Sequence, residues 1–178
     1  GTIQTKFSDS KLSDQMLEIS GIRAVESRAV LDTHVRMPND SVFTLRLFSV
    51  EPDGFQRYHI EQDGGGLQDG TILLSNWFAN VNDLQPGMAL SVFGRNSEET
   101  MTVSDLITTP ELISFYRNAT SWYDGSDFGY LYLSRSEFDR LFGTEGLANQ
   151  FLILFDEDAD QDAALSAAAA LTGDSLSS

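Results

Sequence analysis

The residues from 128 to 143 contain the local pattern that most restricts what this chain can fold into. The run Phe128–Leu133 (FGYLYL) is apolar and has the length of a strand. Ser134 follows it at once and Glu137 comes three residues later, which is the spacing of a helix capping box. Gly143 stands where the helix that follows would stop. The segment therefore predicts a strand that runs directly into a capped helix.

A second strand and helix of the same kind close the chain. Gln150–Phe155 is another apolar run of strand length. Asp160 or Asp162 can cap a helix that extends through Leu171 and has alanines and leucines on one face. Because strands and helices follow each other closely and must share apolar cores, the sequence predicts an α+β chain.

The N-terminal part predicts a helix, and the middle of the chain predicts short strands. Leu12, Met16 and Ile19 recur at steps of four and three within Asp9–Ser20, and Gly21 ends that pattern. Alternation and turn residues divide the following stretch. The expected elements are a strand at Ile22–Met37, a strand at Val42–Val50, a strand at Thr71–Leu74, a helix capped by Ser75 and ending at Val81, and strands at Ala89–Phe93 and Met101–Ile107.

Charge and composition limit the classes of function. The chain has 11 basic and 27 acidic residues, so its formal net charge is −16. Nucleic-acid binding draws its affinity from clustered Lys and Arg, and this balance argues against it. The absence of cysteine excludes disulfides, thiolate metal sites and a cysteine nucleophile. The longest apolar runs fall well short of the roughly 20 residues that cross a bilayer.

No catalytic or phosphate-binding motif occurs in the sequence. G-x-S-x-G, H-E-x-x-H, the Walker A loop and G-x-G-x-x-G are all absent. Gly64–Gly66 is followed by neither a lysine nor a helix start, which favours a hairpin tip over a phosphate loop. A chain with 27 carboxylates contains acid pairs by chance, so such pairs do not indicate a glycosidase. We therefore expect a protein that is not an enzyme, with no catalytic residue and no cofactor.

Histidines and aspartates are the candidate metal ligands. His34 and His59 each lie in or beside an expected strand without a second ligand at short spacing, which favours ordinary strand histidines. Gln161 stands where a calcium loop has its turn glycine, and Ala167 where it has its bidentate glutamate. Four alternating aspartates mimic the start of such a loop, namely Asp156, Asp158, Asp160 and Asp162. The sequence thus predicts the start of a helix there, and no metal site.

Aromatic residues gather between residues 110 and 128, in a connection that also contains Gly, Ser and Asp. Core packing accounts for such residues in most proteins, and the alternative is an exposed aromatic patch. The candidate surface for a partner or an apolar substrate consists of Phe115, Tyr116, Trp122 and Tyr123.

Three phrases of the sequence follow one another in a fixed order: Gly70–Asn80 (GTILLSNWFAN), Leu84–Val92 (LQPGMALSV) and Thr102–Leu112 (TVSDLITTPEL). In this order they resemble the extracytoplasmic domain of FtsX-like and MacB-like ABC transporter permeases. The strands and helices from Phe128 to Leu171 match the end of the family pattern. The resemblance therefore covers nearly all of the chain.

This resemblance implies a two-lobed domain. A porter-like α/β lobe would be built from both chain ends, residues 1–40 and 123–178, with a small β-rich lobe, residues 41–122, inserted between them. The helix around Leu12–Ile19 and the helix around Ala163–Leu171 would then belong to one layer of the first lobe. Membrane helices would lie just before Thr2 and soon after Ser178. In the cell the domain would then be extracytoplasmic, within a membrane protein that is dimeric or pseudo-dimeric.

The resemblance also implies a function without chemistry of its own. The domain would couple membrane-helix motion to substrate or partner handling, while a separate ATPase subunit or domain supplies the energy and an extracytoplasmic protein or peptide is the partner. A free-standing extracellular binding module is the first alternative, and the full reading frame separates the two. A hydrolase is the third reading, and an activity screen tests it.

Overall fold

Two compact units make up the chain in its computed structural model, which describes residues 1–51, 54, 67–108 and 128–173. The first unit joins Gly1–Val30 to Thr144–Ser178, and the second is the continuous segment Leu31–Gly143. Each unit contains both strands and helices. The predicted α+β class is therefore confirmed, as is the organisation in which one lobe is built from both chain ends.

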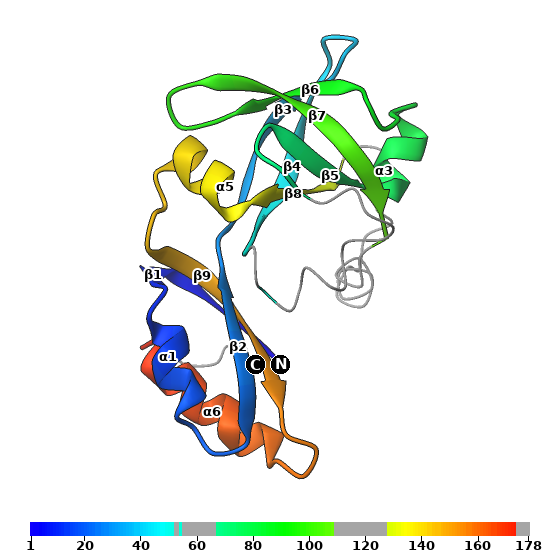
Figure 1. Cartoon of the computed structure of the whole chain (residues 1–178). Coiled ribbons are helices and arrows are strands. Elements are labelled where there is room, and N and C mark those ends of the chain that lie inside the picture. The colour runs from blue at the N-terminus through cyan, green and yellow to red at the C-terminus, as the bar shows by residue number, and fades with distance from the viewer. Residues whose placement is uncertain (52–53, 55–66, 109–127, 174–178) are drawn as a thin grey trace. The chain divides into compact units, whose positions relative to one another are not determined.

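Three antiparallel strands form the sheet of the first unit (Figure 1). The central strand is β9 (Leu147–Phe155), with β1 (Thr2–Asp9) on one side and β2 (Ile22–Arg28) on the other. Phe151 of β9 faces Ile3 across one ladder and Ser27 across the other. A strand from the end of the chain thus holds two strands from its beginning together.

Two helices cover one face of this sheet and pack against each other (Figure 1). They are α1 (Leu12–Leu17) and α6 (Gln161–Leu171). The buried apolar residues between helices and sheet are Ile3, Met16, Ile22, Ala148, Phe151, Ile153, Ala164, Ala168 and Ala169. The prediction that the first and last helices belong to one layer is confirmed.

The second unit is built on a closed barrel with the strand order β3-β4-β8-β5-β7-β6. The barrel closes where β3 pairs with β6, so the first and last strands of the order protect each other's edges. Two of its pairs, β4 with β8 and β5 with β7, are parallel. The strands are β3 (Val30–Arg36), β4 (Val42–Val50), β5 (Thr71–Ser75), β6 (Ala89–Phe93), β7 (Glu98–Ile107) and β8 (Tyr130–Ser134).

Helices α3 (Asn76–Val81) and α5 (Arg135–Phe142) complete the described part of the second unit. The backbone N–H of Glu137 donates to Ser134 Oγ over 3.3 Å, and Gly143 ends α5 with a left-handed φ of 67°. Both the predicted cap and the predicted stop of this helix are confirmed. Phe138 and Leu141 provide its buried face, as its spacing indicates.

Some predicted elements need correction. Residues Thr2–Asp9 form β1, which the sequence did not predict because Ile3 is the one buried residue among them. The helix expected at Asp9–Ser20 is shorter, since α1 spans Leu12–Leu17. The strand expected at Ile22–Met37 is divided into β2 and β3.

The strand expected at Phe128–Leu133 was placed in the lobe of the chain ends, and this placement is wrong. As β8 it pairs with β4 and β5 in the barrel. All of Tyr130–Leu133 is buried, which fits a strand covered on both faces. The expected boundaries after residues 40 and 122 accordingly differ from those of the two units, which lie after Val30 and after Gly143.

Candidate functional site

The aromatic residues expected to form a partner surface, Phe115, Tyr116, Trp122 and Tyr123, lie outside the described residues, as do His59 and Gly64–Gly66. Three features of the described residues have the character of a site. They are an apolar patch on α3, an acidic pocket beside α6 and a network of charged groups around α5.

The α3 patch consists of Trp77 and Val81, which lie one helical turn apart and so share a face of the helix. Their side chains are 51% and 46% exposed, and Trp77 is the most exposed large apolar residue in the described part of the chain. Exposed tryptophan is enriched at protein contacts, because its large ring gains much from leaving water. The patch is therefore suited to contact with another apolar surface.

The other face of α3 is fixed to the barrel. Phe78 is fully buried and meets Phe43 edge to face, with ring centroids 5.4 Å apart. Ser75 precedes the helix as predicted, but its Oγ accepts a hydrogen bond from Tyr130 N over 3.1 Å and none from the helix. The predicted cap is thus wrong in its partner, since the hydroxyl joins α3 to β8. The helix that carries the α3 patch is therefore held firmly against the barrel.

The sequence pattern did not indicate Trp77 as a site residue. A helix of six residues is too short to show a helical period, so Trp77 was noted only as part of the phrase Gly70–Asn80. The spacing of four residues between Trp77 and Val81 was the signal that could have indicated a common exposed face.

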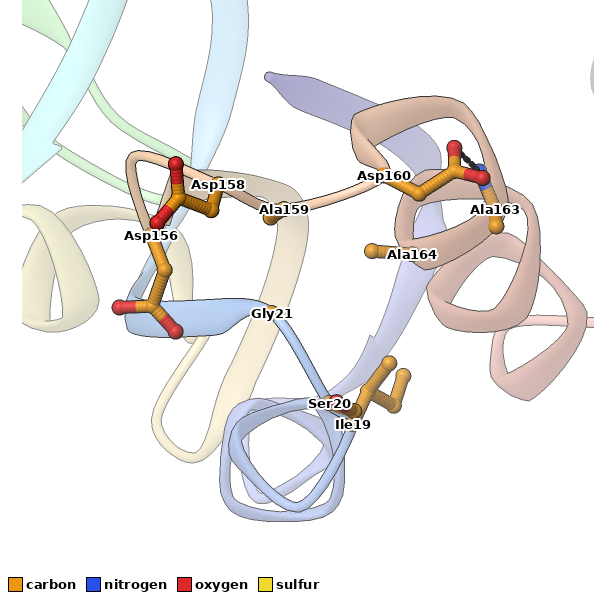
Figure 2. Close-up of a pocket in the computed structure, with 9 residues that line it drawn as sticks. All are labelled: Ile19, Ser20, Gly21, Asp156, Asp158, Ala159, Asp160, Ala163 and Ala164. Atoms are coloured by element: carbon orange, nitrogen blue, oxygen red, sulfur yellow. Dashed lines mark hydrogen bonds between the residues drawn. The ribbon is translucent and has the colours of Figure 1, made fainter.

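A pocket of about 560 Å³ lies in the first unit, where β9 leads into α6 (Figure 2). The N–H of Ala163 donates to the carboxylate of Asp160 over 3.1 Å, the dashed line in Figure 2, so Asp160 caps α6 as predicted. Asp162 lies in the first turn, where the helix dipole favours a negative charge. The lining residues are Ile19, Ser20, Gly21, Asp156, Asp158, Ala159, Asp160, Ala163 and Ala164.

The pocket's carboxylates are not gathered as metal ligands. Over the described ranges, no three His, Cys, Asp or Glu side chains are placed to hold a metal ion together. His34 is exposed on β3, with Nδ1 3.1 Å from Thr44 Oγ, which is an ordinary strand environment. The pocket therefore provides an acidic wall and a helix cap.

Charged side chains tie α5 to the barrel. Arg140 pairs with both Glu99 of β7 and Glu137 of its own helix. Glu137 also accepts a hydrogen bond from Gly70 N over 2.8 Å. The hydrogen bonds from Arg140 lower the pKa of Glu99 below its usual value. The charged groups of this network pair with one another, and their contacts hold α5 against the barrel.

A second set of polar contacts holds the start of α5. The hydroxyl groups of Ser134 and Ser136 both donate to Asp69 Oδ1, over 3.1 and 3.0 Å. Near the same end, Arg135 pairs with Asp139 over 2.8 Å. These contacts account for the polar residues at this helix without a ligand.

These features define a class of domain: a sheet with two helices, built from both chain ends, with a six-stranded barrel in the intervening sequence. No protein-family model matches the sequence, and no curated protein matches it. Solved structures do share the fold.

The extracellular domain of the noncanonic ABC-type transporter YknZ from Gram-positive bacteria is one of them. It is 14% identical with a TM-score of 0.61, over 97% of this chain and 91% of that chain. The periplasmic region of MacB from Actinobacillus actinomycetemcomitans is 13% identical with a TM-score of 0.56, over 96% of this chain and 76% of that chain.

At these identities the likeness concerns the fold. It confirms the resemblance to MacB-like extracytoplasmic domains that the sequence motifs indicated. None of the helices in the described segments has both the length and the apolar character required to cross a membrane.

Proposed function

We propose that this chain is the extracytoplasmic domain of an ABC transporter permease subunit, and that it couples motion of membrane helices to the handling of a substrate or partner outside the membrane. The observation that carries the proposal is the fold likeness to the extracytoplasmic parts of two ABC transporters, which spans 96% and 97% of the chain. Because a fold alone does not fix a function, the proposal requires the tests below.

The arrangement of the chain supports coupling. The first unit contains residues from both chain ends, Gly1–Val30 and Thr144–Ser178. Membrane helices attached at both ends would therefore act on one small sheet. The barrel unit, which lies in the sequence between β2 and β9 of that sheet, would receive the motion through its two chain connections.

The domain has no chemistry of its own in this proposal. ATP is hydrolysed by a separate ATPase subunit, which reaches this chain through the membrane helices of a dimeric or pseudo-dimeric parent. The lack of a phosphate-binding loop in the sequence supports this division of labour.

The surface that meets an extracytoplasmic protein or peptide is proposed to include Phe115, Tyr116, Trp122 and Tyr123. Aromatic residues are enriched at protein contacts, and these four lie close together in the sequence. Full-length parent protein with all four changed to alanine should lose function in a complementation assay, whereas Phe7→Ala, at an exposed aromatic position of β1, serves as the matched control and should keep it. Full function of the fourfold variant would contradict the surface and leave the domain assignment standing.

The reading frame of the parent gene tests the assignment itself. We expect an apolar segment of about 20 residues on each side of this chain, and an ATPase subunit that copurifies with the full-length protein in detergent. A frame without such segments would contradict the proposal and support the free-standing binding module.

A further inference from the structure

The chain leaves the first unit at Val30, and one side chain holds the backbone there. Val30 N donates to Asn149 Oδ1 over 2.7 Å, and Asn149 Nδ2 donates to Val30 O over 2.8 Å. Both hydrogen-bonding groups of one residue's backbone are thus taken by a single carboxamide from β9. Val30 is 7% exposed, so these groups would pay for desolvation if the carboxamide were removed.

This contact lies just beyond a regular ladder. The described pairing of β2 with β9 runs from Ile22 opposite Phe155 to Arg28 opposite Gln150. Two residues after Arg28, the backbone of Val30 is bonded by the side chain of Asn149, whereas in a regular ladder it would be bonded by the backbone of the neighbouring strand. A carboxamide can replace a peptide group in this way, because it has both an acceptor and a donor. Aspartate lacks the donor, and alanine lacks both.

The same extended segment continues into the barrel. Val30 is the first residue of β3, whose Val35 and Arg36 pair with β6. The segment from β2 to β3 therefore takes part in the sheets of both units, and Val30 marks the change from one to the other. The other connection follows α5 and contains Gly143 and Gly146, both with left-handed φ. Main-chain hydrogen bonds hold that connection, from Leu147 N to Thr144 O and from Ser10 N to Gly146 O, whereas at Val30 a side chain holds the backbone.

We propose that Asn149 is a clamp that fixes the direction in which the chain leaves the first unit, and that opening of its two hydrogen bonds allows the chain to bend at Val30. Each hydrogen bond favours the closed state by about two- to tenfold, so opening is rare but reachable without unfolding the ladder. Asn149 is a positioning residue in this role. The clamp is a property of the chain itself, and its link to transport rests on the proposed function.

The test uses the full chain in solution. Because the sequence has no cysteine, Gln15→Cys in α1 and Asn80→Cys in α3 place one spin label on an exposed position of each unit. Asn149→Ala and Asn149→Asp should broaden the distribution of distances between the labels. Asn96→Asp, which makes the same charge change at an exposed turn residue, should leave it unchanged.

Amide exchange measured by NMR supplies the local readout. We expect Val30 N–H to exchange about tenfold faster in Asn149→Ala, which removes its acceptor, and to be less affected in Asn149→Asp, which keeps an acceptor and loses the donor to Val30 O, with protection retained in the β2–β9 ladder. Unchanged Val30 exchange in Asn149→Ala would contradict the clamp. Faster Val30 exchange with an unchanged distance distribution would contradict its control of bending, and loss of protection throughout the ladder in both variants would show a purely structural role. None of these outcomes depends on whether the parent is a transporter.

Discussion

Gly129 shows how closely the backbone of the second unit approaches its core. A Cβ built on this residue would lie 2.6 Å from Cγ and 2.7 Å from Cβ of Phe78, a fully buried residue of α3. Real Cβ atoms do not tolerate such distances, and the atoms concerned are near the main chain of α3. The position therefore requires glycine for space, and its φ is not the reason.

Gly129→Ala should lower the free energy of unfolding by about 1–3 kcal/mol, because α3 or the start of β8 must shift to make room. Urea denaturation measures this. In a Phe78→Gly background the same change should cost clearly less, since both obstructing atoms, Cβ and Cγ of residue 78, are gone. Equal costs in the two backgrounds would contradict the close approach.

The pKa of Glu99 gives a pH-dependent prediction. Hydrogen bonds from Arg140 lower this pKa in the folded state below the usual value of 4.5, so the ionised carboxylate stabilises the fold above that pH. The contribution is lost as the pH falls through the lowered pKa. Glu99→Gln should therefore reduce the melting temperature at pH 7, and the difference from the unchanged protein should shrink below about pH 4.5.

The matched control for this change is Glu157→Gln, at an exposed position before α6. It should leave the melting curves nearly superimposed across the same pH range. A difference for Glu99→Gln that stays constant from pH 7 to pH 3 would show that the effect does not come from ionisation.

Local chemistry made some residues predictable and others not. Ser134 and Gly143 were assigned from neighbouring residues alone, because caps and stops depend on the chain within a few positions. Gly129 was not, since its role depends on Phe78, which is distant in sequence. The four candidate aromatic residues remain a prediction.

At the scale of elements, α5 combines a local signal with tertiary contacts. The sequence predicted a capping box, in which the glutamate would return to the N–H of Ser134. The serine half is present, whereas Glu137 accepts from Gly70 N and pairs with Arg140. The carboxylate of Glu137 thus bonds to Gly70 N and Arg140 and does not complete the capping box. No pattern within the helix could have shown this.

Ser134→Ala should destabilise the protein by about 0.5–2 kcal/mol, because the first turn of α5 loses an acceptor and Asp69 loses a donor. Thermal or urea unfolding measures the loss. Ser20→Ala, at an exposed serine outside any helix, should stay within about 0.5 kcal/mol of the unchanged protein. Equal effects of the two changes would argue against the cap.

The start of α6 leads to a prediction about calcium. If the aspartates from 156 to 162 only shape and cap the helix, millimolar calcium should leave the melting temperature within about a degree. A specific site filled at 100 times its dissociation constant would add about 2.7 kcal/mol instead. A saturable rise that disappears in Asp158→Ala would contradict the prediction.

At the scale of the whole molecule, the strand pairing was beyond the sequence. Apolar runs located β4, β5, β6 and β8 nearly in place, because periodicity is a local property. Which strands pair is decided by contacts between distant segments, such as the parallel pairing of β4 with β8. The strand predicted at 22–37 is likewise divided between two units, and its alternation of apolar and polar residues does not show where the division lies.

Removing residues 2–20 should destabilise the first unit selectively. The deletion takes away β1, which pairs with β9, and Met16, which is fully buried in the core. Amide exchange should show lost protection in β9 and β2, while the barrel strands keep theirs as an internal control. Unchanged protection of β9 would contradict the unit built from both chain ends.

The position of β9 at the centre of the first sheet also dictates an order of events during synthesis. Both β1 and β2 leave the ribosome long before their common neighbour exists, so Ile3 and Ile22 have no sheet to join at that stage. All six barrel strands, by contrast, are complete before residue 147 is made. During synthesis the barrel can therefore fold before the first unit does. The N-terminal segment must remain without its sheet until the C-terminal strand β9 has been made.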